Sequence, residues 1–143
     1  MAYKAAGGSE VVSSRAPEPV GPYPHARREG NLIFVSGIGP RQRGSKEIPG
    51  LTLDAKGNIQ SHDVAVQTRA VIENIKAILE EAGSSLDKVV DVQAFLTDMK
   101  RDFRDFNRIY DEYFRQVGAT RTTIEVSSLP TPIAVELKVI ARA

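Results

Sequence analysis

Cysteine is absent from this chain of 143 residues. Its absence excludes disulfide bonds, thiolate metal sites and a cysteine nucleophile, and it fits a reducing compartment. Histidine occurs only at His25 and His62, which lack the paired spacing of a metal-binding motif. We therefore expect no metal site.

Long apolar runs and charge of one sign are also missing. No run approaches the ~20 apolar residues that span a bilayer, and residues 1–14 lack the apolar core of a signal peptide. We expect a cytoplasmic protein that binds no membrane. The 19 Lys and Arg nearly balance the 18 Asp and Glu, which does not favour nucleic acid, because phosphate contacts need clustered cations.

The length and the 41% hydrophobic content fit a single domain with a real core. We predict one domain over residues 1–143, in which the small and polar residues 1–10 form a loose N-terminal tail.

The first half of the chain predicts a hairpin. Strands are expected at 23–28 and 32–35, with a turn at Glu29-Gly30-Asn31 between them. The run Leu32-Ile-Phe-Val35 is apolar throughout, which is typical of a strand buried on both faces. Residues 38–60 show no strong period and are interpreted as a long loop that contains a turn at 54–58.

Two helices follow, with a strand over 88–97 between them. Ser61 or Asp63 can cap the first helix and Gly83 ends it. Its apolar stripe consists of Val64, Thr68, Val71, Ile75, Ile78 and Leu79. The second helix is expected over about 102–117, ending at Gly118. Its inner side is expected to carry Phe103, Phe106, Ile109, Tyr110, Tyr113 and Phe114.

The chain ends in two strands, 121–126 and 134–141, separated by Leu-Pro-Thr-Pro. Alternation places Arg121 and Thr123 on one face and Thr122 on the other. Glu136 lies inside a β-branched run, where a carboxylate is unusual. It is either a polar residue on a wet sheet face or part of a site with Arg121.

The resulting order, β-β-α-β-α-β-β, predicts an α+β fold with both helices on one face of a mixed sheet. Two common site motifs are not matched. Ser36-Gly37 lacks the surroundings of a nucleophile elbow. Gly37-Ile-Gly39 lacks the third glycine and the following helix of a dinucleotide fingerprint.

Several segments follow one another along the chain: GPYPHA, IFVSGIGP, QTRAVIENIKAILEEAGSSLDKVV, FLTDM, DFNRIYDEYF, RTTIEVSSLP and VELKVIA. Taken in this order, they resemble the Rid (YjgF-type) family of enamine/imine deaminases. The resemblance spans residues 16–141. Within the family, the YPHARR opening and the RTT…LPTP close look most like 2-aminomuconate deaminase of aromatic-acid degradation.

The resemblance implies a chorismate-mutase-like fold, a homotrimer and active sites between subunits. The family's carboxylate-binding arginine corresponds to Arg121 and its acid to Glu136. The remaining matching positions are Tyr23, Ser36, Gly37 and Asn107. Some members carry a cysteine where this chain has Thr123, so any role of that thiol is absent.

The chemistry of 2-aminomuconate agrees with these residues. A guanidinium suits a bidentate contact with a carboxylate, and a carboxylate such as Glu136 can deprotonate water. Backbone N–H groups near Gly37 and Thr122 could hold substrate oxygens. No cofactor is expected, because the substrate supplies its own reactive C=N bond.

The substrate is a dicarboxylate, so a second cation is expected. Arg41 and His25 are the candidates. Two alternatives to a 2-aminomuconate deaminase stay open: a generalist that clears 2-aminoacrylate-type imines, and a stress-related or RNA-directed binding protein.

Overall fold

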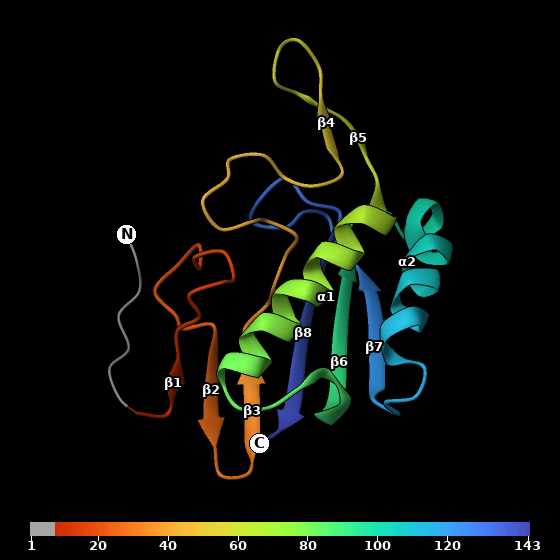
Figure 1. The fold of residues 1–143 in the computed structure, drawn as a ribbon. Helices are drawn as coiled ribbons and strands as arrows, with labels where there is room; N and C mark the ends of the chain where they lie inside the picture. The colour runs from red at the N-terminus through yellow and green to blue at the C-terminus, as the bar shows by residue number, and fades with distance from the viewer. Residues whose placement is uncertain (1–7) are drawn as a thin grey trace.

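A six-stranded mixed sheet forms the centre of the molecule, and both α-helices pack against the same face of it (Figure 1). The computed structural model describes residues 8–143, so most of the tail predicted for residues 1–10 lies outside them. Across the sheet the strands are β1 (Glu10–Val11), β2 (Ala26–Glu29), β3 (Leu32–Val35), β8 (Val135–Arg142), β6 (Val89–Leu96) and β7 (Thr120–Glu125). Only the β6–β7 pair is parallel. The predicted α+β fold with helices on one face is confirmed.

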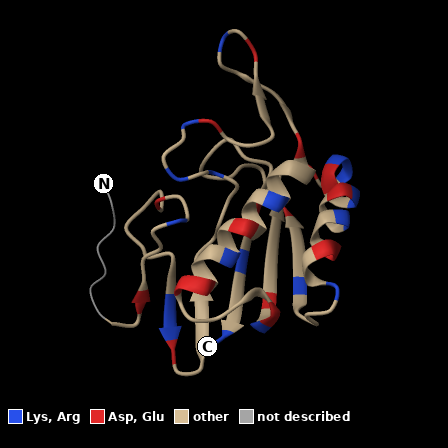
Figure 2. Ribbon diagram, viewed as in Figure 1, with Lys and Arg blue, Asp and Glu red and all other residues tan. Residues whose placement is uncertain are grey.

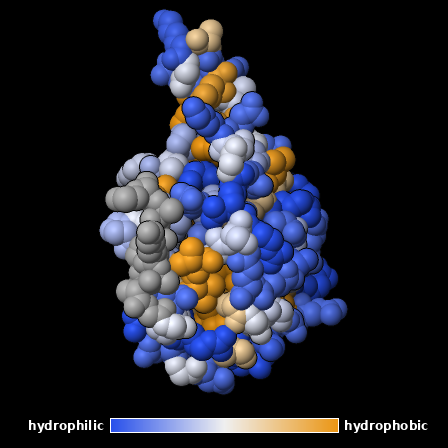
Figure 3. Space-filling model, turned by 60° about the vertical axis from the view of Figure 1, so that its left-hand side comes forward, coloured by the Kyte–Doolittle hydropathy of each residue, from blue (hydrophilic) through white to orange (hydrophobic). Residues whose placement is uncertain are grey.

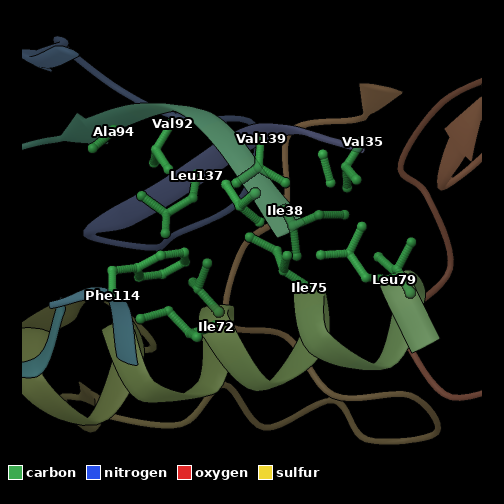
Figure 4. Close-up of a cluster of buried hydrophobic side chains, with 14 of the residues drawn as sticks. Val35, Ile38, Ile72, Ile75, Leu79, Val92, Ala94, Phe114, Leu137 and Val139 are labelled. Carbon is green, nitrogen blue, oxygen red and sulfur yellow. The ribbon is translucent and has the colours of Figure 1, made fainter. Parts of the chain in front are cut away.

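Helix α1 (Val64–Glu81) supplies the middle of the core. Asp63 caps it by accepting a hydrogen bond from the N–H of Val66, and Gly83 follows its end with a φ of +83°. The predicted stripe is buried throughout. In Figure 4 apolar side chains of α1, such as Ile72, Ile75 and Leu79, pack against side chains of the sheet. The sheet residues include Val92 of β6 and Leu137 and Val139 of β8.

Helix α2 (Met99–Phe114) begins three residues before the predicted start. The cause is Asp98, whose carboxylate accepts a hydrogen bond from the N–H of Arg101 and so caps the helix earlier. Phe106 is buried as predicted, but Phe103 is 39% exposed at the rim of the helix.

The prediction that residues 32–35 are buried on both faces is wrong for a single chain. Ile33 and Val35 face the helices, whereas Leu32 and Phe34 are each 37% exposed. They lie on the sheet face that no helix covers, which we call the open face. An apolar run on this strand therefore indicates a surface that a single chain leaves uncovered.

The stretch interpreted as a long loop contains a second, two-stranded sheet. Its strands are β4 (Leu51–Leu53) and β5 (Ile59–His62), and the hairpin projects from the body of the protein (Figures 1 and 3). The turn predicted at 54–58 is confirmed, because Asp54 accepts hydrogen bonds from the N–H groups of Lys56 and Asn58. The strands were missed because each is too short to display a period.

The strand order separates the two residues on which the sequence prediction centred. Strand β6 lies between β7, which carries Arg121, and β8, which carries Glu136. Arg121 is in register with Val92, whereas Glu136 is in register with Phe95. A short 3-10 helix, Leu86–Lys88, lies in the connection from α1 to β6. Over residues 8–143, neither α-helix has the length and apolar character that a membrane span requires.

Candidate active site

Six of the predicted site residues line one pocket. The pocket lies where the chain leaves β3 and where it enters β8, and loop segments 17–20 and 130–133 complete its wall. The predicted residues in it are Tyr23, His25, Ser36, Gly37, Arg41 and Glu136. We call it the Glu136 pocket.

Glu136 is half-buried, and burial raises the pKa of its carboxyl above the 4.5 of an ordinary glutamate. Its carboxylate lies directly against the backbone of Gly37. A Cβ at position 37 would come within 2.6 Å of Glu136 Oε2. Glycine is therefore the residue that lets this carboxylate reach the backbone there.

The turn around Gly37 is held by its neighbours. Ser36 donates its hydroxyl to the carbonyl of Pro24 at 2.7 Å, and the N–H of Ile38 donates to the carbonyl of Leu137. Among the described residues, no hydrogen bond uses the N–H of Gly37. That N–H is available to an oxygen atom in the pocket, beside the Glu136 carboxylate.

His25 is placed for structure and not for binding an anion. Only 1% of it is exposed. Nδ1 accepts a hydrogen bond from the N–H of Ser13, and Nε2 donates to the carbonyl of Pro17 at 2.7 Å. Burial lowers the pKa of the imidazole, which keeps it neutral. The geometry thus argues against the prediction of His25 as a second cation.

Arg41 lies at the pocket with its side chain directed along the N-terminal loop. Its Nη2 donates to the carbonyl of Glu18 at 2.8 Å. The backbone here is fixed from α1, because the Asn74 amide donates to the carbonyls of Gly39 and Arg41 at 3.0 and 2.8 Å. Sequence reasoning missed Asn74, although a polar residue on the buried side of a helix is a detectable signal.

A second buried amide of α1 supports the other wall. Gln67 is fully buried, and its Oε1 accepts a hydrogen bond from the N–H of Ala134 at 2.8 Å. Ala134 precedes β8 by one residue. Gln67 also contacts His62 Nδ1 at 3.1 Å. The two amides, seven residues apart on one helix face, hold the backbone segments that carry Arg41 and Glu136.

Arg121 lies elsewhere, on the helix-covered side of β7. Its Nη2 donates to Asn107 Oδ1 at 2.8 Å. No ion pair of the described residues includes Arg121. Thr123 shares its face, while Thr122 is exposed on the open face. None of these four residues lines the Glu136 pocket.

Metal-ligating side chains do not gather in the described part of the chain. Over residues 8–143, no group of three or more His, Cys, Asp or Glu side chains is close enough to hold an ion. The polar groups that a ligand can meet include the carboxylate of Glu136 and the N–H of Gly37 in the Glu136 pocket, and the guanidinium of Arg121.

The fold and this arrangement define a class: α+β domains with two helices on one sheet face, a half-buried acid in a pocket, and elsewhere an arginine that forms no ion pair within residues 8–143. The family profile described as Endoribonuclease L-PSP matches residues 13–143. A RutC family protein of Pyrococcus abyssi is 43% identical over 132 residues, which cover 92% of this chain and 94% of that protein.

Two solved structures from Escherichia coli share the fold. The YjgF gene product is 30% identical, with a TM-score of 0.79 and coverage of 94% of this chain and 98% of that one. TdcF, solved with bound serine, is 31% identical, with a TM-score of 0.80 and coverage of 95% and 99%. The chain belongs to the family whose profile is described as Endoribonuclease L-PSP, which matches residues 13–143. The predicted resemblance to Rid (YjgF-type) proteins is therefore confirmed. The narrower resemblance to 2-aminomuconate deaminase stays a prediction.

Proposed function

We propose that this protein is a hydrolytic enamine/imine deaminase whose active site is completed between subunits of a homotrimer. One observation carries the proposal. A single chain presents a carboxylate with a raised pKa in one pocket and an arginine without an anionic partner, among the described residues, in another place. Each is half of the machinery that deamination of a 2-imino acid needs.

The chemistry uses these groups as follows. Arg121 binds the carboxylate next to the C=N bond, in the bidentate manner that guanidinium permits. Glu136 accepts a proton from water as the oxygen adds to C2, and the carbinolamine then collapses to the ketone and expels ammonia. The Gly37 N–H is placed to donate to an oxygen of the substrate. Tyr23, in the same pocket, is proposed to assist proton transfer.

For the substrate we propose 2-aminomuconate, an enamine that first becomes the imine by losing a proton from nitrogen and gaining one on carbon. Addition of water to C2 and loss of ammonia would then give 2-oxo-3-hexenedioate. The support is Arg41, a cation at the pocket that contains Glu136. A dicarboxylate needs a second positive group, and Arg41 can supply it by turning from the carbonyl of Glu18. The bound serine of TdcF supports the more general proposal of a 2-imino acid substrate, because serine carries an amino and a carboxylate group on one carbon.

An RNA-directed role is the second candidate, favoured by the description of the matching family profile. The charges argue against it. Figure 2 displays Lys and Arg interspersed with Asp and Glu over the chain, and cations such as Arg15, Arg69 and Arg115 form ion pairs with neighbouring acids. Nucleic-acid binding needs an unneutralised basic surface.

The proposed function is tested by ammonia release from freshly generated 2-aminomuconate, with and without a chelator. Release that exceeds the uncatalysed rate and is unchanged by the chelator is expected. Retention of RNA that falls steeply with salt, without any ammonia release, would favour the second candidate.

The choice of a dicarboxylate is tested by Arg41→Ala. We expect kcat/KM for 2-aminomuconate to fall by about tenfold to a hundredfold, because an ion pair with the distal carboxylate is lost. Turnover of the monocarboxylate 2-aminoacrylate should hardly change. Arg27→Ala is the matched control, because Arg27 is an exposed arginine whose Nε pairs with Glu29, away from the pocket. Equal losses on both substrates would refute a role for Arg41 in substrate choice.

A further inference from the structure

Arg121 faces a set of aromatic rings from α2, which we call the aromatic cradle: Phe103, Phe106 and Tyr110. We propose that the aromatic cradle positions the Arg121 guanidinium for a carboxylate ligand while leaving its charge unneutralised. The inference rests on the proposed carboxylate-binding role of Arg121. It concerns the three aromatic residues, which have no role in the proposed function.

The three rings can all face the Arg121 guanidinium because of their spacing along α2. Positions 103, 106 and 110 lie on one helix face, three and four residues apart. The guanidinium carbon is 4.6 Å from the ring centroid of Tyr110, 5.3 Å from that of Phe106 and 6.0 Å from that of Phe103. All three distances are within the ~6 Å at which a cation is attracted by a ring.

The chemical nature of these partners decides what Arg121 can do. The rings and the Asn107 amide are neutral, so they fix the guanidinium without cancelling its charge. An aspartate or glutamate in their place would form an ion pair, which an incoming carboxylate would have to displace. Held by neutral groups, the cation can pair with a ligand carboxylate at full strength.

Tyr110 shows which part of the side chain matters. Its ring stacks on Phe114 with centroids 4.5 Å apart, so its plane is fixed beneath Arg121. Its hydroxyl is buried and has no hydrogen-bond partner in the part of the chain that the structure describes. The ring is therefore the group that acts on Arg121, and Tyr110→Phe is the matched control for Tyr110→Leu.

Calorimetric titration with 2-oxobutyrate, a stable 2-oxo acid, tests the proposal on the assembled protein. We expect Tyr110→Leu to weaken binding about tenfold, which is in the range of a partly desolvated cation–π contact, and Tyr110→Phe to bind as the wild type does. Arg121→Ala should abolish binding. In the deaminase assay, KM of Tyr110→Leu should rise while kcat and its pH profile stay unchanged.

A second measurement does not depend on a ligand. The NMR resonance of the Arg121 Nε–H should carry a ring-current shift that is reduced in Tyr110→Leu and retained in Tyr110→Phe. If Tyr110→Leu fails to fold, Phe103→Leu replaces it, because Phe103 is 39% exposed and outside the buried core. A smaller loss of binding in the same direction is then expected.

The proposal is overturned if Tyr110→Leu or its replacement binds 2-oxobutyrate as the wild type does, if Tyr110→Phe loses as much as Tyr110→Leu, or if the wild type binds no 2-oxo acid. Binding without ammonia release from any imine substrate contradicts the deaminase function alone and leaves the positioning role of the aromatic cradle standing.

Discussion

Glu136 is the residue on which the proposed chemistry depends, and its surroundings explain how it can act as a base. Burial raises the pKa of its carboxyl, and a base of raised pKa accepts a proton more readily than an ordinary glutamate does. In the proposed substrate complex, the carboxylate bound to Arg121 would neutralise that guanidinium. The arginine would then do little to lower the pKa of Glu136 again.

This account predicts the effect of Glu136→Gln. The variant keeps the shape of the side chain but removes the proton acceptor, so kcat should fall by about 10²- to 10⁴-fold, while gel filtration shows an unchanged assembly. In the wild type, kcat should decline on acidification at a pH above 4.5, because a raised pKa means that the carboxylate is protonated earlier. A variant with the wild-type rate would refute the role of Glu136 as base.

At the residue scale, the sequence predicted which residues belong together better than where they lie. The resemblance brought six residues into one set. The structure places Tyr23, Ser36, Gly37 and Glu136 in one pocket, whereas Arg121 and Asn107 lie outside it. The hydrogen bonds of His25 could not be predicted, because its partners are the N–H of Ser13 and the carbonyl of Pro17, and strand alternation carries no information on either.

Helix α1 is the element that supports the site. Gln67 and Asn74 lie on its buried side and hold Ala134 and the carbonyls of Gly39 and Arg41. Hydrogen bonds from buried amides fix such loops, because leaving a buried donor or acceptor unpaired is costly. The helix thus positions two pocket walls that are far apart in sequence.

The corresponding prediction is that Asn74→Asp destabilises the protein by about 1–3 kcal/mol, since an aspartate cannot donate to two buried carbonyls. Urea unfolding monitored by circular dichroism measures the change. Asn31→Asp is the control, an exposed residue whose side chain makes no hydrogen bond in the described structure. Equal stability of Asn74→Asp and wild type would show that the amide is not required to hold residues 39–41.

The elements themselves were predictable where a period or a cap was strong. The apolar stripe of α1 and its end at Gly83 were clear from the sequence. Helix α2 begins earlier than predicted, because Asp98 caps it. The hairpin β4–β5 was invisible to periodicity, since its strands have three and four residues. Strand order could not be predicted, because sequence alone does not say that β6 inserts between β7 and β8.

At the scale of the whole molecule, the open face of the sheet is the main unexplained surface of a single chain. Leu32, Phe34 and Ile124 are each more than a third exposed on it, and Phe95 lies beside Glu136 in register. An apolar sheet face of this kind is normally covered by another subunit. A homotrimer would cover it and would also bring Arg121 of one subunit toward Glu136 of another.

Mixing two inactive variants tests this central claim most directly. Glu136→Gln and Arg121→Ala are each expected to be inactive alone, and each retains the half of the site that the other lacks. In trimers reassembled from equal amounts, about a quarter of the sites should combine an intact Arg121 with an intact Glu136, and deaminase activity should return to about that fraction of the wild-type value. Mixed trimers verified by native mass spectrometry that stay inactive would contradict a site shared between subunits.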